Sequence, residues 1–347
     1  MTKQISYSDI YENNLDTIID VRSPSEYTLD HILGSINLPA LSDEERKLVG
    51  TVYKQESPFE AKKLGAAIIS RNLSVHLKTV LFSKEKKWRP LIYCWRGGHR
   101  SSAFATVLSE IGWKPLVLNG GYKNYRKVVV DCLHREKLAH RIILISGNTG
   151  SGKTEILQKL NRMSQQIIDL ESLANHKGSI FGATSNPQPS QRLFESHLYD
   201  KFHSFDSNKV VFMEAESNKI GQVSIPPAIW RAMKSASRIE ICVPIAERAR
   251  YLKNSYKNLT SDTEKLNFKL DMLSIQQGTR KVSHWKSLSN SKNFITLATE
   301  LLEDHYDPRY KNSRSRTKSS VIRKLKINKL NETALLESCS KIIEMSN

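Results

Sequence analysis

Short apolar runs alternate along this chain with segments of helical periodicity. Seven runs have the length of a strand, and they lie at 16–21, 89–94, 114–119, 140–146, 165–170, 209–214 and 238–244. The segment 101–112, between two of these runs, has a helical pattern. Strands that alternate with helices form parallel sheets covered by helices. The pattern therefore predicts an α/β protein.

The alternation falls into two series, which meet in the charged stretch 131–140. Residues 1–133 predict a first α/β domain with a mostly helical insertion at about 41–87, where apolar positions recur at helical spacing. Residues 134–347 predict a second α/β domain that ends in a basic, helical region. A chain of 347 residues is long enough for two domains with separate cores.

The charge balance predicts a polyanionic partner. Lys and Arg number 53 and Asp and Glu number 35, which gives a formal net charge of +18. Such an excess favours nucleic acid as the partner. The segment 308–330 holds nine basic residues and no acidic one, and we expect phosphate contacts from Arg314, Arg316 and Lys318. A solvated charged face is the alternative for this segment.

The four cysteines are scattered along the chain and form no C-x-x-C pair. This spacing makes a disulfide framework or a structural zinc site improbable and predicts a reducing compartment. No run approaches the roughly 18 apolar residues of a membrane-spanning helix. We therefore expect a cytoplasmic protein that does not enter a membrane.

A cysteine at the end of a predicted strand is the first candidate for catalysis. The segment that contains it consists of Cys94, Trp95, Arg96, Gly97, Gly98, His99 and Arg100, and a helix follows. Glycines let backbone amides turn toward the thiol, and a helix N-terminus adds positive potential. The positive charges of the two arginines also favour the thiolate, which is the reactive form of cysteine. We predict a nucleophilic Cys94 in an anion-binding loop, with a buried inert cysteine as the alternative.

A complete phosphate-binding motif follows the predicted strand at 140–146. It consists of Gly147, Asn148, Thr149, Gly150, Ser151, Gly152, Lys153 and Thr154. The amides of such a loop surround a diphosphate, the lysine neutralises phosphate oxygens and the threonine binds a metal ion. The motif does not identify the reaction, because a metal-bound diphosphate is also a good leaving group in an alkyl ester.

Acidic residues follow two later strands of the second series. Asp169, Glu171, Glu214 and Glu216 are candidates to contact the diphosphate or a metal ion such as Mg²⁺. Alternatively, only one of the two pairs lines the site and the other caps helices or pairs with arginine. No metal ligand is firmly assigned by the sequence.

The first series resembles a rhodanese domain. The resemblance is carried, in order, by DVRSPSEY at 20–27, HILGSINLP at 31–39, the Cys94 loop and LNGGY at 118–122. It implies that Cys94 carries a persulfide or perselenide and that Asp20, Arg22 and His31 are scaffold residues. Most sulfurtransferases of this family have Cys-x4-Arg. The Cys-x5-Arg loop found here is that of rhodanese-like phosphatases, and it is wide enough for phosphate or selenophosphate.

The chain as a whole resembles the bacterial tRNA 2-selenouridine synthases. Beyond the fusion of the two domains, the resemblance rests on the segments 41–68, 93–101, 169–182, 214–221 and 305–310. It implies that 2-thiouridine at the wobble position of tRNA is S-geranylated from geranyl diphosphate and then receives selenium from selenophosphate.

The resemblance also implies partners and further contacts. The partners would be the anticodon stem-loop of tRNA and an enzyme that supplies selenophosphate. His176, Lys177 and Gly178 would be additional anion contacts. His99 stands where Met or Gln is expected in this family.

Two other functions fit parts of the sequence. The loop length also suits a cysteine phosphatase fused to a P-loop kinase-like domain, which would release phosphate from a phosphotyrosine analogue through Cys94. A non-enzymatic rhodanese module that regulates a nucleotide switch is the third interpretation. The retained cysteine, glycines and arginines argue against that module.

Overall fold

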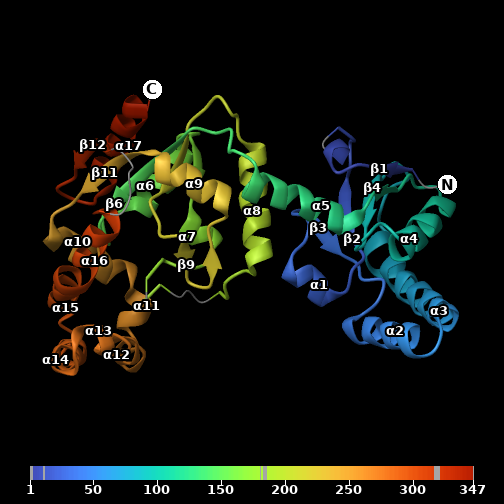
Figure 1. The fold of residues 1–347 in the computed structure, drawn as a ribbon, viewed down its shortest axis with the longest axis horizontal. Coiled ribbons are helices and arrows are strands. Elements are labelled where there is room, and N and C mark those ends of the chain that lie inside the picture. The colour runs from blue at the N-terminus through green and yellow to red at the C-terminus, as the bar shows by residue number, and fades with distance from the viewer. Residues whose placement is uncertain (1–2, 11, 180, 183–185, 316–320, 347) are drawn as a thin grey trace. The chain divides into compact units, whose positions relative to one another are not determined.

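The structure is a computed structural model that describes residues 3–10, 12–179, 181–182, 186–315 and 321–346. The chain forms two compact units, the first made of Met1–Glu136 and Pro189–Asp200 and the second of Lys137–Gln188 and Lys201–Asn347. Each unit has its own five-stranded parallel sheet (Figure 1). The predicted α/β class is confirmed.

The sheet of the first unit has the strand order β1-β5-β4-β2-β3, and all of its pairs are parallel. The strands are β1 (Gln4–Ile5), β2 (Thr17–Asp20), β3 (Ser35–Asn37), β4 (Pro90–Tyr93) and β5 (Leu116–Leu118). Every residue of β4 is buried, as expected for the middle strand of a sheet covered on both faces. Its carboxyl end is therefore held firmly, and Cys94 follows it directly.

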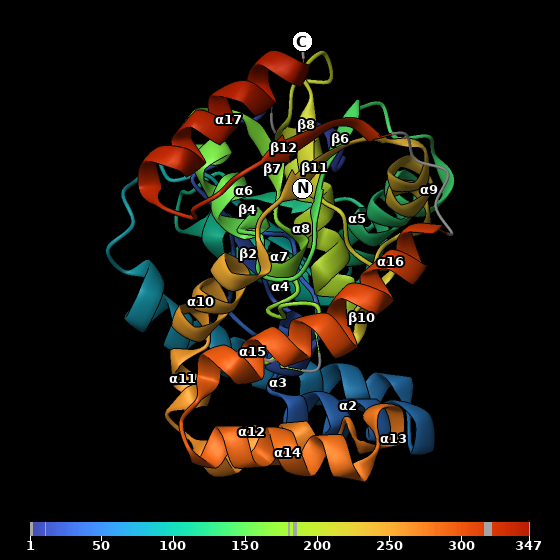
Figure 2. The same ribbon diagram turned by 90° about the vertical axis from the view of Figure 1, so that its left-hand side faces the viewer.

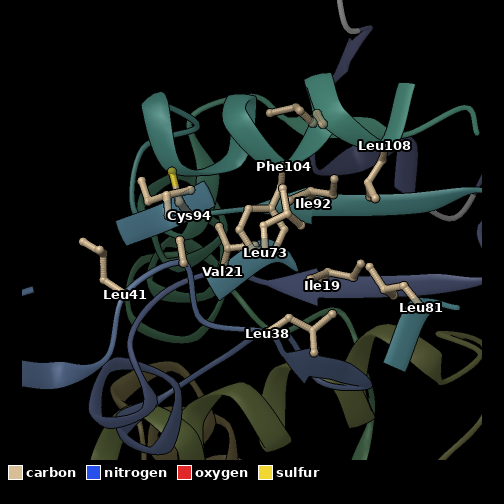
Figure 3. Packing of buried hydrophobic residues seen from close by; sticks show 14 of the residues in the cluster. Ile19, Val21, Leu38, Leu41, Leu73, Leu81, Ile92, Cys94, Phe104 and Leu108 are labelled. Atoms are coloured by element: carbon tan, nitrogen blue, oxygen red, sulfur yellow. The ribbon is translucent and has the colours of Figure 1, made fainter. Parts of the chain in front are cut away.

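The helices of the first unit pack on this sheet. They are α1 (Pro24–Leu29), α2 (Asp43–Gln55), α3 (Pro58–His76), α4 (His99–Glu110) and α5 (Gly121–Val130), with a 3-10 helix at Ser8–Ile10 and π-helices at Leu77–Leu81 and Asp131–Arg135. The predicted insertion thus contains two helices, and Ser42 and Glu45 form a capping box at the start of the first. Leu73 and Leu81 from this insertion pack in one cluster with Ile19, Ile92 and Cys94 (Figure 3).

A segment far along the chain also belongs to the first unit. It is the first part of α8 (Gln191–Ser204). Ser196 donates a hydrogen bond of 2.7 Å to the buried carboxylate of Asp30, and Arg126 forms an ion pair with the buried Glu195. Buried charges need such partners, which explains why these residues join a unit that the sequence predicts to end at 133.

The sheet of the second unit has the order β12-β11-β6-β8-β7 and is also parallel. The strands are β6 (Ile142–Gly147), β7 (Gln166–Ile168), β8 (Val211–Glu214), β11 (Ser237–Cys242) and β12 (Val321–Lys326), and β9 (Lys219–Ile220) pairs with β10 (Val223–Ser224) in an antiparallel hairpin. The last strand lies in the basic region that the sequence predicts as helical. There, pairing with β11 and burial of Leu325 favour an extended backbone.

The remaining helices complete the second unit. They are α6 (Lys153–Arg162), α7 (Leu170–Leu173), α9 (Pro227–Ser235), α10 (Ile245–Ser255), α11 (Lys257–Thr260), α12 (Thr263–Asp271), α13 (Ser274–Gln277), α14 (Thr279–Asn290), α15 (Phe294–Leu301), α16 (Asp307–Ser315) and α17 (Glu332–Ser346), with a π-helix at Leu302–Tyr306. Helices α12, α14 and α15 lie together (Figure 2) around the fully buried Trp285 and have a small core of their own.

Candidate functional site

Cys94 lies at the carboxyl end of β4, and its side chain is buried. The amide of Gly98, the N-cap of α4, donates a hydrogen bond of 3.2 Å to the sulfur, as the inward turn of the loop predicts. The hydroxyl of Ser101, one turn into the helix, lies 3.3 Å from the same sulfur atom. The sulfur thus lies at a helix N-terminus, beside one backbone amide that donates to it and one hydroxyl within hydrogen-bonding distance.

These neighbours set the pKa of Cys94. Burial raises the pKa of the thiol, and this is the largest single effect. Hydrogen bonds from the hydroxyl and amide of Ser101, the positive charge of Arg100 and the amide of Arg96 together outweigh it. The pKa of Cys94 is therefore below its usual value. The geometry favours the thiolate that a nucleophile requires.

The two arginines of the loop have different surroundings. Arg100 forms a 3.0 Å ion pair with Glu26, whose carboxylate also pairs with Arg46 at 3.0 Å. The side chains of Arg96 and His99 are exposed. An incoming anion would therefore meet Arg96, His99 and the loop amides first, since the Arg100 charge is already partly neutralised.

A second glycine turn supports the cysteine loop. The amide of Tyr122 donates a 2.9 Å hydrogen bond to the carbonyl of Cys94, and that of Lys123 donates one of 3.0 Å to Trp95. Gly121 has a φ of +55°, and a β-carbon there would lie 2.3 Å from the carbonyl oxygen of Cys94. The sequence analysis used this LNGGY segment only for the resemblance to a rhodanese domain. It did not predict that the segment contacts the cysteine loop.

The DVR segment forms a buried scaffold, as the resemblance implies. The carboxylate of Asp20 and the guanidinium of Arg22 form an ion pair with almost no solvent exposure. The guanidinium also lies 3.9 Å from the ring centroid of Tyr122, and the hydroxyl of Tyr122 donates to Asp30 at 2.6 Å. Nδ1 of His31 donates a 2.9 Å hydrogen bond to the carbonyl oxygen of Tyr27. These contacts fix the strand ends around the loop.

The phosphate-binding motif begins at the end of β6 and leads into α6. Gly150 and Gly152 have φ values of +79° and +75°, which L-residues rarely adopt. The Lys153 ammonium donates a 2.9 Å hydrogen bond to the carbonyl of Gly147, so its charge lies over the loop. This is the strand, loop and helix arrangement that binds a diphosphate.

Residues from distant segments hold this loop in place. Arg248 on α10 donates a 3.1 Å hydrogen bond to the carbonyl of Thr149 and forms an ion pair with Asp307 at 2.6 Å. The amide of Gly147 donates to the hydroxyl of Tyr310 at 2.8 Å. Asp307 and Tyr310 belong to the segment HYDPRY, which was a usable signal for them. Nothing in the sequence indicated Arg248.

The four predicted acidic residues influence one another's charges, and Lys153 acts on two of them, Glu171 and Glu216. Burial and then the charge of Glu216 raise the pKa of Glu171 to about 7, while Lys153 lowers it. Burial raises the pKa of Glu216 as well, against the effect of Lys153. The pKa of the buried Glu214 is also raised, by burial and by the surrounding carboxylates. The site thus favours a cation or a proton between its carboxylates.

Asp169, one of these acidic residues, also caps a helix. Asp169 is the N-cap of α7 and accepts hydrogen bonds of 2.8 Å from the amide of Ser172 and from the side chain of Gln158. The charge of Asp169 also raises the pKa of Glu171 and Glu214, so the two predicted pairs are not divided into one that lines the site and one that caps helices. Within the described ranges, no group of three His, Cys, Asp or Glu residues has the geometry to hold a metal ion.

The segment 176–178, in which further anion contacts are expected, lies against Glu171 and Glu216. A β-carbon at Gly178, whose φ is +64°, would lie 3.0 Å from a carboxylate oxygen of Glu216 and 3.1 Å from one of Glu171. The amide of Gly178 donates to His176 at 3.1 Å, and the Lys177 ammonium lies 4.7 Å from the ring centroid of Tyr256. A small residue is required at 178 for this close approach.

The comparisons with known proteins match both units. The family model of the rhodanese-like domain matches residues 6–128, and that of the tRNA 2-selenouridine synthase AAA domain matches residues 140–281. A tRNA 2-selenouridine synthase of Shewanella denitrificans is 30% identical over 93% of this chain and 95% of its own length. The chain belongs to the tRNA 2-selenouridine synthase family.

Two further members show how far the similarity extends. The synthase of Nitrosomonas europaea is 36% identical over 69% of this chain, and the match spans 63% of that protein. The synthase of a Sulfurovum species is 31% identical over 86% of this chain and 82% of its own length. The similarity to these synthases thus extends over both units of the chain.

The residues expected to contact tRNA are only partly described. Arg314 is in α16, whereas Arg316 and Lys318 lie outside the described residues. No helix in the described part of the chain is long and apolar enough to cross a membrane.

Proposed function

We propose that this chain converts 2-thiouridine at the wobble position of tRNA to 2-selenouridine through S-geranyl-2-thiouridine. The observation that carries the proposal is the presence, in one chain of this family, of a thiol with a lowered pKa and a complete phosphate-binding loop. Each site suits one half of a two-step exchange. The substrates are geranyl diphosphate and selenophosphate.

The first step takes place at the phosphate-binding loop. The sulfur of 2-thiouridine attacks C1 of the geranyl group, a C–S bond forms, and the C–O bond to the diphosphate breaks. The base releases its N3 proton to solvent. Lys153 and the loop amides stabilise the negative charge that the leaving diphosphate acquires. The alkylated sulfur then becomes a leaving group, which a thiocarbonyl sulfur is not.

The second step uses the cysteine loop. Selenium replaces the geranylthio group at C2 of the uridine, so that a C–Se bond forms, the C–S bond breaks and geranylthiol leaves. We propose that selenophosphate binds in the loop of Trp95, Arg96, Gly97, Gly98, His99 and Arg100 and that the Cys94 thiolate attacks its phosphorus. An S–P bond forms, the P–Se bond breaks, and the released selenide attacks C2. Cys94 is thus a covalent carrier of the phosphoryl group, which water then removes as phosphate. The hydrogen bonds from Gly98 and Ser101 to the sulfur support this role.

We propose that Mg²⁺ binds together with the diphosphate. The hydroxyl of Thr154 and a single carboxylate of the acidic group, together with oxygens of the diphosphate itself, would supply the oxygen ligands that Mg²⁺ prefers. A buried oxygen of Glu214 has no hydrogen-bond partner among the described residues, which fits a cation nearby. When bound, the ion would neutralise charge on the leaving diphosphate.

The formal charge of +18 supports tRNA as the macromolecular substrate. The wobble base lies in an anticodon loop, where it is already unpaired and open to an enzyme. We place the reaction in the cytoplasm, where an enzyme that makes selenophosphate would supply the second substrate.

The experiment that tests the proposal is nucleoside analysis by mass spectrometry after incubation of 2-thiouridine tRNA with both substrates. Cys94→Ser should accumulate S-geranyl-2-thiouridine and form no 2-selenouridine. Cys132→Ser, in the same unit but outside the loop, is the matched control and should behave as wild type. Formation of 2-selenouridine at the wild-type rate by Cys94→Ser would exclude the carrier role. Release of phosphate from a phosphotyrosine analogue without any selenium transfer would favour a phosphatase.

A further inference from the structure

An apolar pocket opens beside the phosphate-binding loop in the second unit. It contains about 570 Å³ of space not filled by atoms, part of it open to solvent. Its apolar walls include Phe181, Leu252, Leu266, Phe294, Leu297 and Leu301.

The pocket is continuous with the diphosphate site. Thr149 of the loop is part of the lining. Leu252 also lines the pocket and packs on the loop, since a β-carbon at Gly150 would lie 3.0 Å from its side chain. A molecule whose diphosphate lies in the loop can therefore extend into the apolar space lined by residues of α10 and α15.

The chemistry of the walls defines the tail of that molecule. The lining is almost entirely aliphatic and aromatic, and its polar side chains are the hydroxyls of two threonines and two tyrosines and the amine of Lys253. Its described residues include no carboxylate or side-chain amide of the kind that pairs with the edge of a nucleotide base. An apolar chain gains affinity from each methylene that it buries here.

We propose that this pocket binds the isoprenyl chain of the diphosphate ester, so that the loop and the pocket together select an isoprenyl diphosphate over a nucleotide. The inference rests on the proposed function for the use of geranyl diphosphate. It adds the binding site of the tail and the residues that select its length. Leu266, Leu297 and Leu301 are buried and would contact the carbons farthest from the diphosphate.

The first test needs no variant. Binding of inorganic diphosphate, dimethylallyl diphosphate and geranyl diphosphate to the full chain is measured by calorimetry with Mg²⁺ present. We expect each five-carbon unit to lower Kd by at least about tenfold, since each buried methylene adds affinity. Equal Kd values for the three ligands would overturn the pocket proposal.

The second test fills the pocket. Ala298 on α15 is part of the lining, whereas Ile295 on the same helix is exposed. Ala298→Trp should raise the Kd of geranyl diphosphate at least about tenfold and leave that of inorganic diphosphate unchanged. Ile295→Trp is the matched control, with both Kd values as in wild type. Circular dichroism and thermal melting establish that both variants are folded.

The outcomes separate this inference from the proposed function. If Ala298→Trp still binds and transfers the geranyl group as wild type does, the pocket is not the tail site, although the proposed function stands. If the wild type binds geranyl diphosphate in the pocket but never alkylates 2-thiouridine, the tail site stands and the proposed first step is wrong. Tight binding of ATP that Ala298→Trp abolishes would overturn the assignment of the pocket to an isoprenyl chain.

Discussion

Gly121 lies against the carbonyl oxygen of Cys94, so closely that a β-carbon at 121 would be 2.3 Å from that oxygen. The same β-carbon would lie 2.6 Å from the amide nitrogen of Gly97. The cysteine loop therefore depends on a glycine in another segment, at the start of α5. This contact links the shape of the candidate site to a residue that performs no chemistry.

We predict that Gly121→Ala destabilises the protein and disturbs the loop. A left-handed backbone costs an L-residue about 1–2 kcal/mol, and overpacking adds about 1–3 kcal/mol. The free energy of unfolding, measured with urea, should fall by about 2–5 kcal/mol, and alkylation of Cys94 should slow. Gly34→Ala is the control, because Gly34 has a φ of +79° but no described atom within 4 Å of where a β-carbon would lie. Wild-type alkylation in Gly121→Ala would contradict the contact.

The pH dependence of alkylation should reveal the lowered pKa of Cys94. Only the thiolate reacts with iodoacetamide, so a lower pKa moves the rise in rate to lower pH. Cys132, whose pKa is raised by burial and by Glu136, should react only at higher pH in the same experiment. Mass spectrometry of the alkylated peptides measures both sites. If the alkylation rate of Cys94 rises at the same pH as that of Cys132 or at a higher pH, the loop does not favour the thiolate.

Ser101→Ala should shift this profile. The Ser101 hydroxyl counteracts the effect of burial on the pKa of Cys94. Without this hydroxyl the pKa of Cys94 rises, and the alkylation curve moves to higher pH. Ser102→Ala changes an exposed serine in the same helix and should leave the curve in place. If the two variants give the same curve, the Ser101 hydroxyl does not set the pKa.

Lys153→Ala should abolish use of geranyl diphosphate. Loss of a group that stabilises the leaving diphosphate typically costs on the order of 10²–10³ in rate. S-geranylation of 2-thiouridine tRNA by purified protein measures the effect. Alkylation of Cys94 should be unchanged, because Lys153 lies in the other unit. Lys209→Ala, at an exposed lysine of the same unit, serves as the control, and normal geranylation in Lys153→Ala would assign the loop to another ligand.

The basic segment 308–330 is predicted to contact tRNA. Log affinity falls with log salt by about 0.7–0.9 per phosphate contact. Replacing Arg314, Arg316 and Lys318 with Ala should therefore weaken binding and reduce the slope by roughly two to three units. Filter binding over a salt series measures both quantities.

A second triple variant controls for net charge. Lys63→Ala, Arg135→Ala and Lys286→Ala remove the same charge from side chains that already form ion pairs with carboxylates. This control should leave the slope near wild type. An unaltered slope in the first triple variant would mean that those residues form a solvated face.

The sequence was sufficient for features that depend on neighbouring residues. Alternation of apolar runs and helical segments predicted three strands of the first sheet and four of the second, because burial of one strand or helix face imposes its own period. The strand, glycines, lysine and threonine of residues 147–154 predicted the phosphate-binding loop, since a loop of this kind is built from consecutive amides. The nucleophile at Cys94 was predicted for the same local reason.

The tertiary structure decided which distant residues complete each site. Gly121 and Glu26 contact the cysteine loop, and Arg248 and Tyr310 hold the phosphate-binding loop. No local period encodes such pairs, because they depend on how separate elements pack and on which buried polar groups need partners. The strand at Val321–Lys326 has the same explanation, because pairing with β11 sets its extended backbone. The apolar pocket also depends on the tertiary structure, because its walls come from segments far apart in the sequence.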